Sequence, residues 1–240
     1  GSVLGPREET GRAMARVLIV AAYFPPHVGG YDVSMYQLAK RLVRRGYEVD
    51  VLTCNTEKSP TMEVMDGISV RRLPAWNTMG GVYPIPKPTL TTLKVLRSIC
   101  GTRYDLVQTV TRFFVTSQMG WAIAKARRSP ICHVELGSAH SLLAGKAVEL
   151  AGRSYDHTLG ALVVGGASIL MCNSNAGAAF VKHLGVRKPV KVIPTCGVDT
   201  ALFARRHTDM RDNLGLSGAA VIACISRLIF AKGVQDLIMA

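Results

Sequence analysis

Two cations near the end of the chain have the residue types and the spacing to hold a phosphate. An apolar run at residues 219–225 leads to Arg227 and Lys232, and a short helical pattern follows. Free backbone N–H groups and the helix dipole would add to these two fixed charges at the start of that helix. A strand and one helix cannot bury both faces of a parallel sheet, so we expect these residues to begin a second domain that is mostly absent from the chain.

A glycine pair near the other end of the chain is a second candidate site. Gly29 and Gly30 follow the first apolar run, at residues 16–22, and precede a helical pattern at residues 32–45. Glycines let a backbone approach a phosphate or a sugar ring closely, and a helix N-terminus offers unpaired N–H groups. A tight turn that binds nothing explains the pair equally well. The spacing is not that of the three-glycine dinucleotide fingerprint, so we expect neither a nicotinamide nor a flavin cofactor.

Polar residues stand at the ends of two later strand patterns. His133 and Glu135 lie on the same side of a predicted strand at residues 131–136, because side chains alternate along a strand. We expect Glu135 to face a ligand at the end of this strand, whereas His133 is better explained as a hydrogen-bonded core histidine. Asn173 and Ser174 follow the next strand pattern. Ser174 is also a suitable N-cap for the helix that comes after it, which explains this residue without a ligand.

The elements that would position these residues alternate along the chain. Continuous apolar runs predict buried parallel strands, and apolar residues at helical spacing predict the helices between them. The predicted strands are 16–22, 49–53, 68–73, 106–110, 131–136, 169–172 and 190–194, and the predicted helices are 32–45, 90–100, 116–126, 141–151 and 176–184. This order predicts an α/β fold, a doubly wound Rossmann-like parallel sheet with helices on both faces. Prolines and glycines at residues 76–88 predict an exposed loop.

The composition is that of a folded protein with a strongly basic surface. Of the 240 residues, 48% are hydrophobic, and the mean hydropathy is +0.22, but no apolar run is long enough to span a bilayer. The six cysteines are far apart, which favours reduced cytosolic thiols and gives no sign of zinc or iron–sulfur ligation. Gly1 and Ser2 are typical of residues left by cloning.

The net charge of +13 attracts polyanions, which include nucleic acid, anionic lipid and phosphorylated small molecules. The basic residues are scattered and only 6% of residues are aromatic, which argues against nucleic acid. The basic cluster at residues 40–45 either ends a solvated helix or faces an anionic membrane surface, and both interpretations remain open.

Four sequence motifs in order resemble one enzyme family. They are PPHVGGYDVSMYQLAKRL, ILMCNSNAGAAFVKHLG, VIPTCGVDTALF and SRLIFAKGVQDLIMA. Together they resemble the retaining nucleotide-sugar glycosyltransferases of the GT-B fold, family 4, over residues 16–240. The resemblance implies two Rossmann-like domains, of which the N-terminal one mainly receives the acceptor and the C-terminal one binds the donor. On this basis residues 1–15 are a tail, 16–200 the acceptor-side domain and N-terminal half of a GT-B fold, and 201–240 a linker with the first βα unit of an incomplete nucleotide-sugar-binding domain.

The resemblance also implies roles for single residues. Arg227 and Lys232 match the family's Arg and Lys that hold the donor diphosphate and stabilise the departing nucleotide, and no metal is expected. Gly29 and Gly30 match the family's N-terminal glycine loop. With the strand-end residues Glu135 and His133, which were chosen by position and not by the resemblance, the catalytic candidates are Arg227, Lys232 and Glu135, and the substrate-binding candidates are Gly29, Gly30, His133, Asn173 and Ser174.

Two positions depart from the family pattern. Leu136 stands where many relatives have a His near the reacting centre of the sugar, and residues 195–196 stand where the family usually shows an Asn. The first departure leaves no position-for-position match for that His. The second concerns one polar contact in the segment that leads toward the second domain.

The leading functional hypothesis is a retaining hexosyltransferase-type glycosyltransferase without a cofactor, which transfers a sugar from a UDP- or GDP-sugar to a lipid, glycan or small molecule. We expect residues 1–240 alone to be inactive, and a strand at residues 219–225 with unpaired edges to promote self-association. The alternative is a non-enzymatic acceptor-binding module that works with a separate donor-domain chain. Nucleic-acid binding is a third hypothesis, suggested by charge alone. We expect a cytoplasmic location, with peripheral contact to an anionic membrane as a further option.

Overall fold

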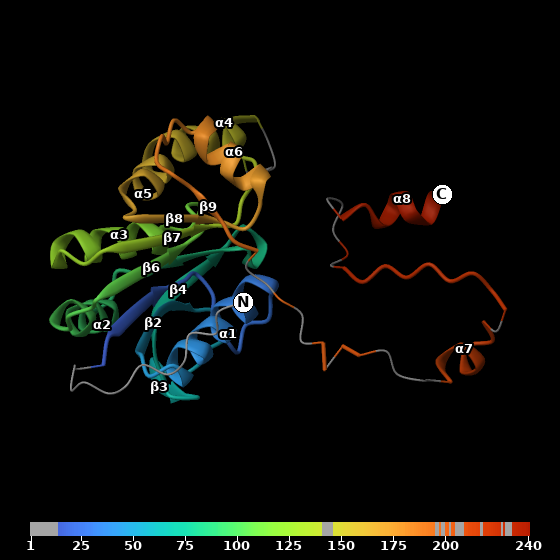
Figure 1. Cartoon of the computed structure of the whole chain (residues 1–240), viewed down its shortest axis with the longest axis horizontal. Helices are drawn as coiled ribbons and strands as arrows, with labels where there is room; N and C mark the ends of the chain where they lie inside the picture. The colour runs from blue at the N-terminus through green and yellow to red at the C-terminus, as the bar shows by residue number, and fades with distance from the viewer. Residues whose placement is uncertain are drawn as a thin grey trace, which may run out of the picture. The chain divides into compact units, whose positions relative to one another are not determined.

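The structure of the protein is a computed structural model that describes residues 14–140, 146–194, 197, 200, 201, 203, 204, 209–216, 218–226, 228 and 232–240. The chain divides into two compact units (Figure 1), a first unit of Gly1–Cys196 and a second unit of Gly197–Ala240. The candidate residues of the glycine loop and of the strand ends all belong to the first unit.

The first unit is built on one mostly parallel sheet. Its strand order is β3-β4-β2-β1-β6-β7-β8-β9, and β5 pairs with β4 beside this path. The strands are β1 (Arg16–Val20), β2 (Glu48–Asn55), β3 (Met62–Met65), β4 (Ile68–Thr78), β5 (Tyr83–Pro86), β6 (Leu106–Val110), β7 (Ile131–Glu135), β8 (Ile169–Cys172) and β9 (Lys191–Val192). The pairs that β4 forms with β3 and β5 are antiparallel, and the others described are parallel.

Helices cover both faces of this sheet (Figure 1). They are α1 (Gly30–Arg44), α2 (Leu90–Gly101), α3 (Val115–Arg127), α4 (Lys146–Tyr155), α5 (Ala161–Gly166) and α6 (Asn175–His183). Alternation along β1 explains the two layers, since Val17 and Ile19 share a core with α1, whereas Leu18 and Val20 share a second core with α2 and α3. The predicted doubly wound α/β fold is confirmed.

Residues 76–88 form a hairpin, so the predicted loop was wrong. β4 continues to Thr78, a short 3-10 helix η1 (Met79–Gly81) makes the turn, and β5 pairs back with Trp76 opposite Ile85. Pro84 and Pro86 do not prevent this, because a strand beside the main sheet path tolerates a missing N–H where it faces away from the ladder. The end of β4 therefore continues as an ordered two-stranded ribbon with β5.

A nearly continuous helix joins β7 to β8. α4 passes into a π-helical turn η2 (Asp156–Gly160), and α5 follows it directly. The sequence predicted a helix over residues 141–151 only, and residues 141–145 lie outside the described part. The π-helical turn matters for the site because it brings Asp156 into the interior, where it is 1% exposed.

The second unit contains two short helices among its described residues, α7 (Met210–Asn213) and α8 (Val234–Met239). Residues 219–225 form no strand, contrary to prediction, since none of the described residues pairs with them in a ladder. Strand propensity alone does not make a strand without a neighbour to bond. The helical pattern predicted after Lys232 is present as α8.

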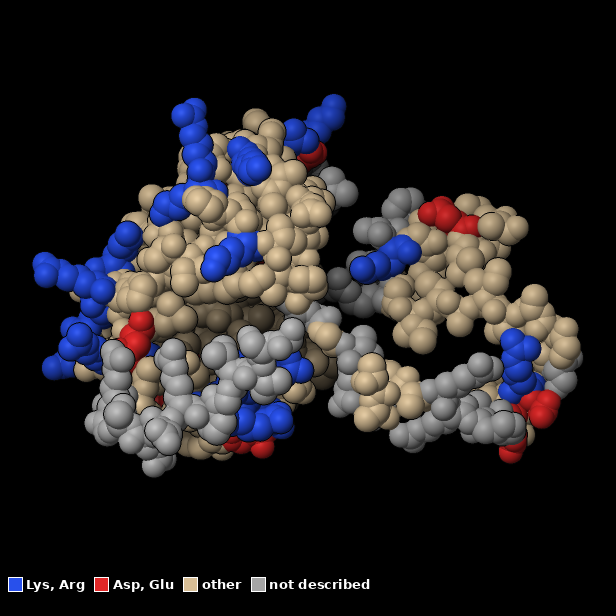
Figure 2. Space-filling model, in the orientation of Figure 1, with Lys and Arg blue, Asp and Glu red and all other residues tan. Residues whose placement is uncertain are grey.

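The described residues include basic side chains on the surface and free cysteines in the core, as the composition suggested. In Figure 2, Lys and Arg side chains gather at the edge of the first unit where α2 and α3 lie, and Lys125 and Arg127 occupy the last turn of α3. Buried Cys54 and Cys132 are free, and burial raises their pKa to about 12 and about 11. They are therefore protonated core residues near neutral pH. No helix among the described residues combines the length and apolar character needed to cross a membrane.

Candidate functional site

The carboxyl ends of β1 and β6 mark the point where the order of strands reverses. β1 leads to α1 on one face of the sheet, and β6 leads to α3 on the other face. Ligands of doubly wound sheets bind outside the strand ends at such a switch point. The loop after β1 carries Gly29 and Gly30, and Arg112 follows β6 closely. This edge of the sheet is therefore the candidate functional site.

The two glycines of the first loop have different reasons to be glycine. Gly29 is the N-cap of α1, and a Cβ at this position would lie 3.0 Å from the Oδ2 atom of Asp32. Gly30 begins the helix, and a Cβ there would meet nothing within 4 Å. Packing inside the protein thus explains Gly29 only. Open space beside Gly30, at a helix N-terminus with unpaired N–H groups, leaves room for a ligand.

Buried polar groups hold this loop in place. Asp32, in the first turn of α1, is 1% exposed and pairs with Nδ1 of His27, whose ring stacks on Tyr23 at 4.2 Å. Burial raises the pKa of the Asp32 carboxyl, and the hydrogen bond from His27 offsets only part of this effect. Nη2 of buried Arg72 donates to the carbonyl oxygen of Pro25 at 2.6 Å. The loop is accordingly preformed, and a buried carboxyl with a raised pKa, such as that of Asp32, is typical of functional sites.

Aromatic side chains line the same edge. The ring of Phe114 lies 5.7 Å from Tyr23, 6.1 Å from Tyr31 and 5.7 Å from Tyr83. The Tyr83 hydroxyl, on the hairpin, donates to the carbonyl oxygen of Phe113 at 2.9 Å. Burial raises the pKa of Tyr23 to about 12, so this hydroxyl remains a donor at neutral pH. Aromatic walls with a few oriented polar groups are the usual lining of a small-molecule site.

Arg112 organises the neighbouring strand ends. It is 2% exposed, and its Nη1 lies 3.0 Å from Oε1 of Glu135. Its Nε and Nη2 donate hydrogen bonds to the two carboxylate oxygens of Asp156 at 2.8 and 3.1 Å. Its guanidinium carbon lies 4.5 Å from the centroid of the Phe180 ring. The preceding Thr111 has φ +59°, a rare value for a β-branched residue, and so turns the chain at this point.

Glu135 is buried rather than turned toward an open space, which corrects the expected orientation. It is 0% exposed, and Oε1 also accepts from the backbone N–H of Gly137 at 2.7 Å, while Oε2 accepts from the N–H of Arg112 at 3.1 Å. Burial by itself would raise the pKa of Glu135. The hydrogen bond of His133, the charges of His133 and Arg112 and the Gly137 N–H outweigh it, and the pKa is lowered. Its catalytic role stays a prediction.

The remaining candidates of the first unit have structural partners. His133 is 0% exposed, with Nδ1 2.8 Å from Oγ1 of Thr109 and Nε2 3.4 Å from Glu135, which fits the core-histidine interpretation. Ser174 caps α6 by accepting from the N–H of Gly177 at 3.1 Å, as its sequence position suggested. The Oδ1 atom of Asn173 is buried and has no hydrogen-bond partner among the described residues, a state that in a native structure calls for an explanation such as a bound ligand.

The candidates of the second unit are only partly described. Lys232 is exposed and precedes α8 by two residues. Arg227 lies outside the described residues, as do residues 195–196 and 198–199 of the predicted connecting segment. The predicted roles of Arg227 and Lys232 therefore stay predictions.

Sequence reasoning missed Asp32, Arg112 and Asp156. Arg112 follows a buried strand pattern, which is the same signal that identified Glu135 and Asn173. Asp156 gives no comparable signal, because its partners Arg112 and His140 lie 44 and 16 residues away in the chain. Only the fold brings these charges together.

Comparison with known proteins places the chain among glycosyltransferases. A family described as Glycosyltransferase Family 4 matches residues 28–202. An uncharacterized glycosyltransferase of Methanocaldococcus jannaschii is 25% identical over 232 residues, which cover 94% of this chain and 58% of that protein. A D-inositol 3-phosphate glycosyltransferase of Thermomonospora curvata is 28% identical over 93% of this chain and 56% of its own length.

A solved structure has the same fold. The Anabaena protein HepE, crystallised in complex with UDP, matches with a TM-score of 0.62 and 20% identity over 95% of this chain and 57% of its own length. The chain thus spans little more than half the length of these relatives. The shared fold is the Rossmann-like α/β fold of GT-B proteins.

Proposed function

Because the chain belongs to glycosyltransferase family 4, we propose that it supplies the acceptor-side half of an enzyme that transfers a sugar from a nucleotide diphosphate to an acceptor with retention of configuration. The family match over residues 28–202 supports the reaction class. UDP in the HepE complex supports a nucleotide-sugar donor, as UDP- or GDP-sugar. The acceptor we propose is a lipid, a glycan or a small molecule.

The observation that carries the proposal is the open space beside Gly30. This residue starts α1 at the switch point of the sheet, and apart from its neighbours and its own helix no described residue has an atom within 4 Å of where a Cβ would stand. Developing negative charge on the departing diphosphate is stabilised by fixed dipoles and cations placed where the charge appears. We propose that the N–H groups at the start of α1 serve this purpose, and that Arg227 and Lys232 have the same role as cations.

The buried charges of the first unit have a supporting part in this proposal. Arg112 and Glu135 fix the backbone of residues 135–139, since Nη2 of Arg112 also donates to the carbonyl oxygen of Ala139 at 3.0 Å. Both oxygens of Glu135 are engaged. We therefore propose that Glu135 positions this strand end, and that Asn173 contacts the substrate through its unpartnered Oδ1. Basic residues at the edge where α2 and α3 lie would favour binding of the protein to the surface of an anionic membrane that carries a lipid acceptor.

Turnover of nucleotide sugars tests this function. The natural full-length protein is incubated with UDP- and GDP-sugars, and release of UDP or GDP is followed together with product formation. We expect turnover with one class of donor and its loss, by about a hundredfold or more, in Lys232→Ala, because a cation on the leaving phosphate is removed. The matched control is Arg153→Ala, an exposed cation paired with Glu149, which should remain active. Undiminished turnover in Lys232→Ala would overturn the assigned role.

The same assay separates the enzyme from the binding-module alternative. An acceptor-binding module would release no nucleotide from any donor. It would instead need a separate donor-domain chain that co-purifies with it. Nucleotide release by the single purified protein therefore removes this alternative.

A further inference from the structure

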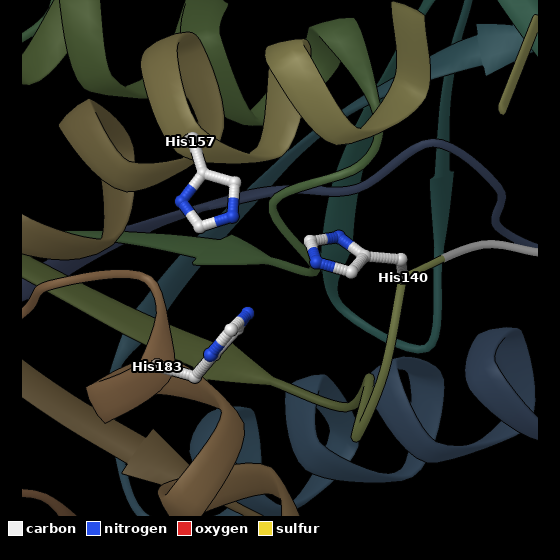
Figure 3. Close-up of side chains that lie close together, drawn as sticks. All are labelled: His140, His157 and His183. Carbon is white, nitrogen blue, oxygen red and sulfur yellow. The ribbon is translucent and has the colours of Figure 1, made fainter. Parts of the chain in front are cut away.

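Three histidines from separate parts of the sequence meet on the surface of the first unit. His140 lies in the segment after β7, His157 lies in the π-helical turn η2, and His183 ends α6. One ring nitrogen of each lies within 4.8 Å of the others, and Figure 3 shows the three rings turned toward one another. None of these residues has a part in the function proposed above.

The three rings are inclined to one another, so that their edges, and not their faces, point toward a common centre. Their centroids are 5.4, 5.7 and 5.5 Å apart, and the planes of the three pairs are inclined at 45°, 74° and 69°. A stacked pair would direct its nitrogens past each other. Tilted rings instead let in-plane lone pairs point to one place, as in metal centres formed by imidazoles.

A buried carboxylate orients one of the rings. Nδ1 of His140 lies 2.7 Å from Oδ2 of Asp156, and Asp156 is itself held by two bonds from Arg112. With Nδ1–H as the donor, Nε2 of His140 keeps its lone pair for a ligand. A carboxylate that holds the second nitrogen is the common outer partner of a metal-binding histidine.

The other two histidines are free to adjust. His157 and His183 are exposed, whereas His140 is half-buried. Zinc–nitrogen bonds of about 2.0–2.1 Å require the ligand nitrogens of a tetrahedral site to be about 3.3 Å apart. Rotation of the two exposed rings toward His140 would have to shorten nitrogen separations that are at present up to 4.8 Å to that spacing.

We propose that His140, His157 and His183 bind one Zn²⁺ ion, with the fourth coordination position open to water. Imidazole ligands select zinc, copper or nickel and reject Mg²⁺ and Ca²⁺, which prefer oxygen. The ion would join the segment after β7, the turn η2 and the end of α6. It would thereby stabilise the segment that Arg112 holds at Ala139, one residue before His140. This ion takes no part in the sugar transfer.

Zinc titration by calorimetry tests the site on the untagged, metal-free protein. We expect one equivalent to bind, and we expect His157→Gln and His183→Gln each to weaken binding by at least about tenfold. Both residues are exposed, so neither change should lower the melting temperature without zinc. Lys182→Gln, next to His183 in α6, is the matched control and should bind as the unchanged protein does. Mg²⁺ should give no binding.

Cobalt in place of zinc identifies the ligands. A site of three imidazoles and water gives visible d–d bands without the near-ultraviolet thiolate band that exposed Cys224 would produce. Absence of saturable zinc binding would overturn the proposal, and so would a thiolate band or unchanged affinity in either histidine variant. In those cases the three rings are merely packed against one another, with His140 and His183 also packed against Phe180 at 4.9 and 5.8 Å between ring centroids.

Discussion

Arg112 and its two carboxylate partners form a charge network inside the protein. Arg112 is 2% exposed, Asp156 1% and Glu135 0%, and every charged group in this set has an opposite partner. Burial of charges is costly unless they are paired and hydrogen-bonded. Gly137 completes the arrangement, because a Cβ there would lie 2.9 Å from Nη1 of Arg112. The network therefore fixes the backbone at the ends of β6 and β7.

The lowered pKa of Glu135 predicts the acid sensitivity of the fold. In the unfolded chain this carboxyl returns to its ordinary pKa of 4.5, so the folded protein binds the proton less readily. The stability that Glu135 contributes is then fully present above that value and is lost as pH falls through the lower, folded pKa. We expect Glu135→Gln to show a shallower fall of unfolding free energy below pH 4.5 than the unchanged protein. Urea unfolding at a series of pH values measures both slopes.

Parallel slopes in the two proteins would contradict this prediction. The comparison concerns the slope and not the absolute stability, because Glu135→Gln also leaves Arg112 with one anionic partner fewer. The control is Glu149→Gln, which removes a partly exposed carboxylate paired with exposed Arg153 and should leave the slope nearly unchanged.

At the scale of elements, the close packing of α3 against the sheet depends on Gly120. A Cβ at this position would lie 2.5 Å from Cγ2 of Thr109 on β6 and 3.1 Å from Cβ of Val20 on β1. We expect Gly120→Ala to lower the unfolding free energy by about 1–3 kcal/mol, since the helix must move away from the sheet. Gly101→Ala is the matched control, because Gly101 ends α2 in the open, with nothing within 4 Å. Chemical denaturation of both variants measures the difference in unfolding free energy. Equal stabilities would show that the contact between α3 and the sheet can accommodate a methyl group at position 120.

The sequence predicts an element well where the residues of that element alone show a clear apolar pattern. The runs that form β6 and β8 were predicted with the observed bounds, because most of their residues are apolar or β-branched, which is typical of strands. β3 was missed because its four residues alternate between half-buried and exposed, and β5 was missed because of Pro84 and Pro86.

Among the residues of the candidate site, Gly29 and Gly30 could be predicted from their place at the start of a helix. Arg112 and Asp156 could not be paired, because only the fold joins residues 44 positions apart.

For the whole molecule, the first unit provides one side of the proposed reaction. It carries the glycine loop, the aromatic edge and the unpartnered oxygen of Asn173, and it spans most of the residues that the family matches. The cations proposed for the donor diphosphate belong to the second unit. The chain spans little more than half the length of the relatives described above, so the complete reaction is a property that we propose for the full-length protein.

The turnover of Gly30→Ala in the natural full-length protein tests the central claim most directly. A Cβ at Gly30 meets no protein atom within 4 Å, so the melting temperature should match that of the unchanged protein. If a diphosphate or sugar approaches this helix start, the added methyl group displaces it, and turnover of the UDP- or GDP-sugar should fall by about tenfold or more. Gly101→Ala should keep full turnover. Full turnover in Gly30→Ala, at unchanged stability, would contradict a substrate site at the start of α1.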